Sequence, residues 1–220
     1  MKFDAVLFDC DGVLVDSEPI TNGVLRDMLE ERGWKLSREE CMRLFVGKAV
    51  KDEAAVIEAN TGQPVTEEWL VRFRERRNVG LERDLVAIRN AVSAVRTLHE
   101  RFAGRIACAS GADLFKVKLQ LEKVGLMRYF DGRCFSGHEL PRSKPFPDVY
   151  LAAAAALGAD PTRCVVVEDT ITGVTAGVAA GATVFGYSPS EAGHDAPGAL
   201  RQAGATTIFT DMAQLPALVG

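Results

Sequence analysis

The feature that most constrains the fold is an alternation of short apolar runs with helical segments from residue 90 to the C-terminus. The runs predicted as strands are 105–109, 133–135, 163–167, 183–185 and 207–209. The helices predicted between them are 90–100, 114–124, 148–157, 173–180 and 197–203. Such alternation is typical of crossover units, which build a parallel sheet with helices on both faces. We therefore expect an α/β fold, with the apolar run 3–8 as a further strand of the same sheet.

A stretch with a different pattern separates the first strand from the rest. Apolar residues recur there every three or four positions, as Leu25 and Met28 illustrate, and no strand-like run occurs. This predicts an all-helical unit at 17–83, inserted into a sheet-containing core at 1–16 and 84–220.

Composition narrows the class of partner. The chain has 220 residues, is 47% hydrophobic and 25% charged, and carries a net charge of -4, which gives no electrostatic reason to expect nucleic acid or an anionic membrane. The longest apolar stretch, 149–159, is too short to span a bilayer, and the N-terminus lacks the pattern of a signal peptide. We expect a cytoplasmic protein, a monomer or weak homodimer, with no nucleic-acid or membrane partner. Its five cysteines have no zinc-site spacing and are expected to be small buried residues.

Two carboxylates, Asp9 and Asp11, stand two positions apart where the first apolar run stops. Residues i and i+2 of a strand point to the same side, so we expect the two side chains to share one face. Carboxylates that close repel each other unless a cation lies between them, a proton is shared, or each takes a different role. Gly12 then allows a sharp turn and close approach to a ligand. The alternative is a strand followed by an ordinary Asp-Gly turn.

Polar groups also follow other predicted strands. Ser110 and Gly111 follow one strand, Glu168 and Asp169 follow another, and Lys144 precedes a helix after a third. Ligands of such sheets bind beyond the carboxyl ends of the strands. The sequence therefore predicts a polar constellation at one edge of the sheet.

Each of these groups has a structural alternative. Ser110 and Asp113 could form a capping box, Asp169 could cap the next helix, and Lys144 could be an exposed surface lysine. However, a helix N-terminus beside a hydroxyl binds phosphate well. A second acid next to Asp169 is more than a cap requires, and Pro145 restricts Lys144 to an extended conformation.

Four motifs carry a resemblance to a known family: Phe8-Asp9-Cys10-Asp11-Gly12-Val13-Leu14-Val15-Asp16-Ser17-Glu18, Cys108-Ala109-Ser110-Gly111, Lys144-Pro145-Phe146-Pro147-Asp148 and Val167-Glu168-Asp169-Thr170-Ile171-Thr172-Gly173. In their order and spacing the chain resembles the haloacid dehalogenase-like hydrolases, specifically the capped phosphatases and β-phosphoglucomutase-like enzymes. Phe135-Ser136-Gly137 and Ile208-Phe209-Thr210-Asp211 are similar to 6-phosphogluconate-type phosphatases. The resemblance implies a Rossmann-like core with an inserted helical cap domain.

The resemblance also implies an Mg²⁺-dependent phosphatase that forms an aspartyl-phosphate. Asp9 would attack phosphorus, and Asp11 would protonate the leaving oxygen and then take a proton from water. Mg²⁺ would be held by Asp9, the backbone carbonyl of Asp11, Asp169 and, directly or through water, Glu168.

The remaining implied residues bind substrate. Ser110, the amide of Gly111 and Lys144 would hold the phosphoryl oxygens, which gives Ser110 and Lys144 a catalytic role as well. The segment 45–51 resembles the family's cap loop. The substrate expected is a small phosphorylated metabolite, a sugar or sugar-acid phosphate.

The cap loop is where substrate choice is expected. Gly47, Lys48 and Lys51 would face the substrate, and Lys48 and Lys51 would contact its anionic or hydroxyl groups. The alternative for both lysines is an exposed helix end. If one of them instead formed an imine, the enzyme would be a phosphonate hydrolase.

The histidines bear on a second alternative, a sugar phosphomutase. Mutase relatives carry a histidine shortly after the first motif, where this chain has Pro19-Ile20-Thr21-Asn22, and the first histidine here is His99. Hydrolysis is therefore favoured, and His99, His138 and His194 are expected to be surface or structural residues. Asp11 argues against a dehalogenase, and four intact motifs argue against a non-catalytic binding module.

Overall fold

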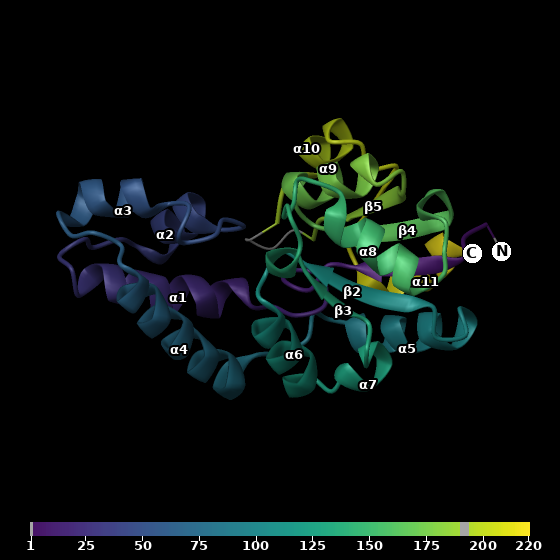
Figure 1. The fold of residues 1–220 in the computed structure, drawn as a ribbon, viewed down its shortest axis with the longest axis horizontal. Helices are drawn as coiled ribbons and strands as arrows, with labels where there is room; N and C mark the ends of the chain where they lie inside the picture. Colours follow the sequence, from purple (N-terminus) through teal and green to yellow (C-terminus); the bar gives the residue numbers. More distant parts are fainter. Residues whose placement is uncertain (1, 190–193) are drawn as a thin grey trace. The chain divides into compact units, whose positions relative to one another are not determined.

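A computed structural model describes residues 2–189 and 194–220, and the chain divides into two compact units (Figure 1). The core unit comprises Met1–Asp16 and Val86–Gly220, and the helical unit comprises Ser17–Leu85. The second boundary therefore falls two residues later than the sequence pattern predicted.

The core unit contains a six-stranded parallel sheet in the order β3-β2-β1-β4-β5-β6. Its strands are β1 (Ala5–Phe8), β2 (Ile106–Ser110), β3 (Cys134–Ser136), β4 (Cys164–Glu168), β5 (Thr183–Tyr187) and β6 (Thr207–Phe209). Every neighbouring pair is parallel. The predicted strands all exist, with ends displaced by at most two residues, and the α/β fold is confirmed.

Helices cover both faces of the sheet, so its strands are apolar on both sides. The helices are α5 (Ala91–Arg101), α6 (Leu114–Lys123), α7 (Met127–Phe130), α8 (Asp148–Ala156), α9 (Ile171–Ala179), α10 (Pro197–Gln202) and α11 (Leu215–Val219), with short 3-10 turns at Gly137–Glu139, Pro161–Arg163 and Met212–Gln214. Figure 1 shows α8, α9 and α10 on one face and α5, α6 and α7 on the other. Leu7 and Val166 belong to the same buried cluster as Val149 of α8, and across the sheet the rings of Phe8 and Phe130 meet edge to face at 6.0 Å.

The register of the sheet brings the ends of three strands together. Phe8 of β1 lies beside Cys108 of β2 and Val167 of β4. The strand order reverses between β1 and β4, and ligands of such sheets bind beyond the strand ends at this reversal. The residues that follow Phe8, Cys108 and Val167 therefore emerge where a ligand is expected.

The helical unit contains α1 (Glu18–Glu30), α2 (Arg38–Phe45), α3 (Ala54–Thr61) and α4 (Glu67–Asp84). Across residues 17–85, all of which the structure describes, the regular structure is helical. The apolar residues at helical spacing form its buried core: Leu25, Met28, Leu29, Cys41, Phe45, Ile57, Trp69, Leu70 and Phe73. A capping box begins α2, in which Ser37 Oγ accepts from the Glu40 amide and the Glu40 carboxylate accepts from the Ser37 amide.

Two expectations from composition concern membrane-spanning helices and the state of the cysteines. Within the described ranges, no helix combines the length and apolarity that a bilayer crossing requires. All five cysteines are unbridged thiols; Cys134 is half-buried and the others are buried.

Helix α9 packs closely against the sheet at Gly177. A Cβ at this position would lie 2.8 Å from Val184 Cγ2 and 3.1 Å from Val166 Cγ1. Gly177→Val should lower the free energy of unfolding by roughly 1–3 kcal/mol, because overpacking forces the helix away from the strands. Urea denaturation measures the change. Gly198→Val in α10 is the matched control, since nothing lies within 4 Å of a Cβ there. Equal losses in both variants would contradict this packing.

Candidate active site

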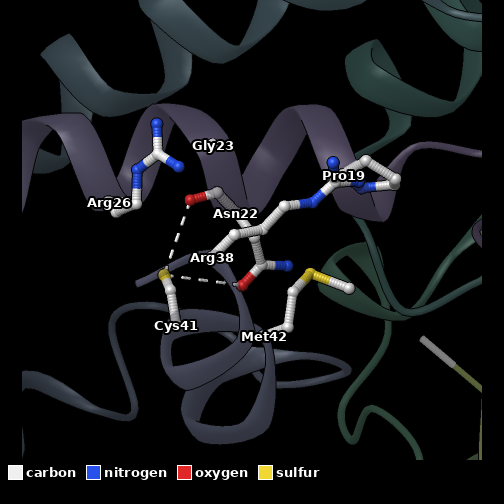
Figure 2. A pocket seen from close by; sticks show the side chains of 7 residues that line it. All are labelled: Pro19, Asn22, Gly23, Arg26, Arg38, Cys41 and Met42. Atoms are coloured by element: carbon white, nitrogen blue, oxygen red, sulfur yellow. Dashed lines mark hydrogen bonds between the residues drawn. The ribbon is translucent and has the colours of Figure 1, made fainter. Parts of the chain in front are cut away.

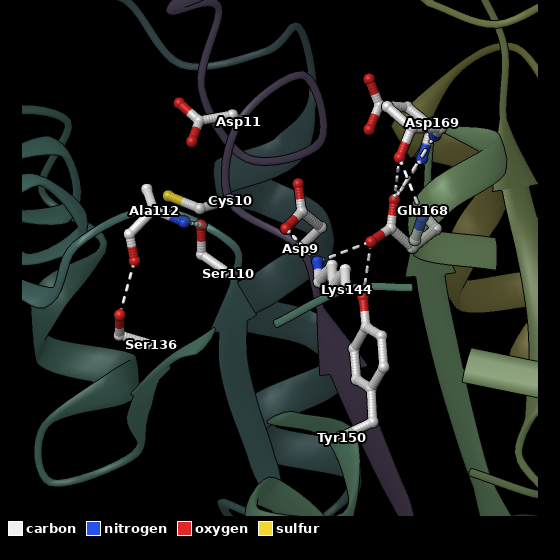
Figure 3. A network of polar contacts seen from close by, with 12 residues as sticks. Asp9, Cys10, Asp11, Ser110, Ala112, Ser136, Lys144, Tyr150, Glu168 and Asp169 are labelled. Atoms are coloured by element: carbon white, nitrogen blue, oxygen red, sulfur yellow. Dashed lines mark hydrogen bonds and ion pairs between the residues drawn. The ribbon is translucent and has the colours of Figure 1, made fainter. Parts of the chain in front are cut away.

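Three buried carboxylates converge beyond the ends of β1 and β4 (Figure 3). Asp9 follows β1, Glu168 ends β4, and Asp169 follows it. One oxygen from each lies within 4.8 Å of the others, and the three residues are 7%, 1% and 2% exposed. Like charges packed this closely need a counter-charge or a proton.

Lys144 supplies part of that counter-charge. Its Nζ donates to Asp9 Oδ1 and to Glu168 Oε1, both at 2.6 Å. The lysine side chain is only 8% exposed, so the alternative of an exposed surface lysine is wrong. Burial raises the pKa of Asp9 to about 7, although Lys144 acts in the opposite direction. Burial opposes charge on Lys144 too, but the carboxylates of Asp9 and Glu168 hold its pKa well above the usual value.

Glu168 is fixed by several donors at once. Its Oε1 accepts from Lys144 and, at 2.6 Å, from the hydroxyl of Tyr150. Its Oε2 accepts from the Asp169 amide at 3.1 Å and from the Thr170 hydroxyl at 3.2 Å. Tyr150 is fully buried in α8. Its pKa is raised well above the usual value, mainly by burial and secondly by the negative charge of Glu168. Tyr150 was not predicted from the sequence, although a tyrosine in an otherwise Ala-rich helix is a usable signal.

Two glycines let the backbone lie against these carboxylates. Gly12 has a φ of +76°, and a Cβ there would overlap Asp169 Oδ2. A Cβ on Gly173, in the first turn of α9, would overlap the Glu168 carboxylate. The sharp turn expected at Gly12 is therefore present, whereas its close approach to a ligand stays a prediction.

Asp11 does not share a face with Asp9. Its Oδ1 accepts from Lys116 Nζ and from Gln120 Nε2, both at 2.8 Å. In Figure 3 the Asp11 carboxylate points away from that of Asp9. The expectation of a shared face is wrong because β1 ends at Phe8, so strand alternation does not extend to these two residues. Lys116 and Gln120 were also missed; their signal is a polar i, i+4 pair beside the apolar stripe of α6.

The capping alternatives for Ser110 and Asp169 are wrong as well. The N-cap of α6 is Asp113, and Ser110 instead ends β2 and accepts from the Ala112 amide at 3.0 Å. The N-cap of α9 is Thr170, whose hydroxyl accepts from the Gly173 amide. Neither Ser110 nor Asp169 therefore caps a helix.

The sequence-predicted residues fall into two sets. Those of the core unit lie around the ends of β1, β2 and β4: Asp9, Asp11, Ser110, Gly111, Lys144, Glu168 and Asp169. Gly47, Lys48 and Lys51 belong to the helical unit, between α2 and α3. There Gly47 has a φ of 70°, and Lys48 pairs with Glu53 at 3.3 Å. Lys48 and Lys51 are both exposed.

His194 lies against the carboxylate cluster rather than on the surface. Its Nε2 is 2.9 Å from the Gly12 carbonyl oxygen and 3.9 Å from Asp169 Oδ2. Its ring packs edge-on against Tyr187, and its side chain is 5% exposed. The histidine therefore helps to fix the turn after Asp11, which is a structural role of the kind expected but in an unexpected place.

The helical unit has a small cavity of its own (Figure 2). Asn22, Arg26, Arg38 and Cys41 are among its lining residues. Cys41 Sγ contacts the Asn22 backbone oxygen at 3.5 Å. None of the sequence-predicted site residues lines this cavity.

Comparisons with known proteins agree with this geometry. Residues 3–181 match the model of the haloacid dehalogenase-like hydrolase family. The chain is 28% identical to 6-phosphogluconate phosphatase of Escherichia coli K12 over 99% of its own length and 95% of the relative's. It is 31% identical to hexitol phosphatase B of the same organism, over 80% and 79% of the two chains. A hydrolase of this family from Deinococcus radiodurans, with bound phosphate and sodium, superposes with a TM-score of 0.81 at 36% identity, over 99% and 95% of the chains.

The raised pKa of Asp9 predicts how stability depends on pH when divalent cations are removed. Since folding raises this pKa from 3.8 to about 7, the folded state binds the proton more tightly than the unfolded chain does. The resulting stability is fully present below about pH 4 and is lost as the pH rises through about 7, at roughly 1.4 kcal/mol per pKa unit. Urea titrations in a chelator between about pH 5 and pH 8 should show this decline.

Asp9→Asn is the control for that experiment. The variant lacks the titrating carboxyl, so its unfolding free energy should fall less over the same pH range. A wild-type curve as flat as that of the variant would show that Asp9 does not carry a raised pKa.

Proposed function

The chain belongs to the haloacid dehalogenase-like hydrolases, and we propose from this that it is an Mg²⁺-dependent phosphatase acting through an aspartyl-phosphate on a small phosphorylated metabolite. Its family and its phosphatase relatives identify it as an enzyme of the phosphatase type. The observation that carries the finer proposal is the buried cluster of Asp9, Glu168 and Asp169 with Lys144 at 2.6 Å from two of them.

Asp9 would act as the nucleophile. As its carboxylate oxygen bonds to phosphorus, the bond from phosphorus to the ester oxygen breaks, and Asp11 gives that oxygen a proton. Water then attacks phosphorus, Asp11 takes a proton from the water, and the bond from phosphorus to Asp9 breaks. The products are an alcohol and inorganic phosphate. Both residues follow β1 at its carboxyl end.

Lys144, Ser110 and the amide of Gly111 would hold the phosphoryl oxygens. Phosphoryl transfer depends mainly on positioning and on stabilising charge, and a buried ammonium group is effective at both. Lys144 already contacts the proposed nucleophile, so it would lie beside the phosphorus during attack.

The carboxylate cluster fits a hard divalent cation, because its donors are oxygens only and carry more negative charge than Lys144 can offset. Asp9, Asp169 and the backbone carbonyl of Asp11 would hold Mg²⁺. Glu168 would contact it through water, because both of its oxygens already accept hydrogen bonds. Bound Mg²⁺ would supply positive charge against the phosphoryl group. The related Deinococcus hydrolase has bound phosphate and sodium, which is compatible with binding of phosphate and a cation by this chain.

The substrate proposed is a sugar phosphate or a sugar-acid phosphate. Relatives named for 6-phosphogluconate and hexitol phosphates support this class. Gly47, Lys48 and Lys51 of the helical unit are proposed to contact the part of the substrate beyond the phosphate. Lys48 and Lys51 are exposed, which is compatible with this role.

The first test is phosphate release from a panel of phosphorylated metabolites, with and without Mg²⁺. We expect Mg²⁺-dependent release concentrated on a sugar or sugar-acid phosphate, and none from Asp9→Asn, which should remain folded.

Transfer of phosphate from C1 to C6 of a hexose without release would instead establish a mutase. Borohydride trapping with a phosphonoaldehyde would reveal an imine on Lys48 or Lys51. Turnover retained by Asp9→Asn would contradict the aspartyl-phosphate.

Lys144→Met tests the charge stabilisation. The variant keeps an unbranched side chain, one atom shorter, but loses the ammonium group that contacts Asp9 and Glu168, so kcat should fall by roughly 10²–10³-fold. Lys118→Met, an exposed lysine of α6, is the matched control and should keep wild-type kcat. Circular dichroism establishes that both variants are folded. A kcat for Lys144→Met within about threefold of wild type would exclude the proposed role.

A further inference from the structure

Two buried donors converge on a single oxygen next to the proposed nucleophile. Lys116 Nζ and Gln120 Nε2 each lie 2.8 Å from Asp11 Oδ1. The Lys116 side chain is 8% exposed, and Gln120 is fully buried. The two residues are one turn apart on α6, so they present their donors from the same face of the helix.

The orientation of the Gln120 amide is set from its other side. The Cys10 thiol lies 3.5 Å from Gln120 Oε1 and donates to it, which leaves the amide nitrogen directed at Asp11. The helix itself begins at a side-chain cap, where Asp113 accepts from the Lys116 amide at 2.8 Å. Lys116 and Gln120 therefore form a fixed cradle for one anionic oxygen, and we call this pair the α6 cradle.

This resting position is not one from which Asp11 can perform acid–base chemistry. The ester oxygen that needs a proton is bonded to the phosphorus that Asp9 attacks, whereas the Asp11 carboxylate points away from Asp9 (Figure 3). Asp11 must therefore turn toward Asp9 during the reaction. Its departure leaves the buried ammonium of Lys116 without the carboxylate that neutralises it, which is costly for a lysine only 8% exposed.

We propose that the α6 cradle exchanges the Asp11 carboxylate for a carboxylate on the leaving group of the substrate. This inference rests on the proposed phosphatase function and specifies its substrate class as phosphate monoesters of hydroxycarboxylic acids. The bound substrate would restore the charge balance of Lys116 at the moment when Asp11 turns to protonate the ester oxygen. A neutral sugar offers only hydroxyl groups to the cradle, which replace a carboxylate poorly beside an ammonium group.

The geometry also limits where the substrate carboxylate can be. An aspartate side chain spans only a few ångströms, so the cradle and the ester oxygen must both lie within its reach. The substrate carboxylate therefore has to come within a few ångströms of the ester oxygen. Short acid phosphates satisfy this when extended, and a longer sugar-acid phosphate satisfies it only when folded back.

The test compares matched pairs of substrates that differ only in the carboxylate. The pairs are phosphoglycolate with ethylene glycol monophosphate, 3-phosphoglycerate with glycerol 3-phosphate, and 6-phosphogluconate with glucitol 6-phosphate. We expect kcat/KM of the wild type to favour the acid at least tenfold in one or more pairs. Lys116→Met should reduce that ratio at least tenfold, and Gln120→Leu should reduce it less, because it removes a donor but no charge.

Controls separate this role from a merely structural one. Lys118→Met, on the exposed face of α6, should keep the wild-type ratio. Lys116→Arg should recover part of the preference. If Lys116→Met does not fold, Lys116→Gln carries the same comparison. Calorimetric binding of each pair to Asp9→Asn, with and without Lys116→Met, gives the preference without turnover and should show the same change.

The outcomes distinguish failure of this inference from failure of the proposed function. p-Nitrophenyl phosphate has no carboxylate on its leaving group, so its hydrolysis by the wild type tests the phosphatase function alone, and Lys118→Met should hydrolyse it within about threefold of wild type. Phosphate release from no ester would overturn the phosphatase itself. Normal release with no acid preference in the wild type, or with a preference that survives in Lys116→Met, would overturn the role of the α6 cradle alone.

Discussion

The structure of the site depends on one electrostatic constraint, the accumulation of carboxylates at the carboxyl ends of β1 and β4. One carboxylate oxygen each of Asp9, Glu168 and Asp169 lies within 4.8 Å of the other two, and the three residues are almost completely buried. Neighbouring parallel strands deliver them to the same edge, so their repulsion is a direct result of the topology. Such an arrangement is stable only where cations, protons or dense hydrogen bonding compensate it.

The surrounding residues meet this constraint in different ways. Lys144 reaches two of the carboxylates from the segment before α8, and Tyr150 donates to one of them from within that helix. The backbone amides of Asp169 and Thr170 donate further hydrogen bonds to the Glu168 carboxylate. The carboxylate has room in this position because Gly173 has no side chain. Burial raises the pKa of Asp9 to about 7 despite Lys144, so the compensation of this carboxylate is incomplete.

Sequence alone predicts those parts of the molecule that are encoded locally. Apolar runs and helical periodicity place every strand of the sheet to within two residues, and the polar groups after the strands identify Asp9, Glu168 and Asp169. The orientation of Asp11 was predicted wrongly, because it depends on where β1 ends and on Lys116, which lies 105 positions away in the chain. Contacts of that kind are set by how α6 packs, and no local pattern encodes this.

The repulsion between Asp9 and Asp11 is reduced by an arrangement that was not among those expected from the sequence. Asp9 and Asp11 turn apart, and each takes its own lysine, Lys144 or Lys116. Both lysines are largely buried, so each pair is held in a low-dielectric setting. Together with Glu168 and Asp169, these residues bring four carboxyl groups close to two ammonium groups among the described residues. A divalent cation would offset negative charge in this cluster, which is a physical reason to propose one here that does not depend on family resemblance.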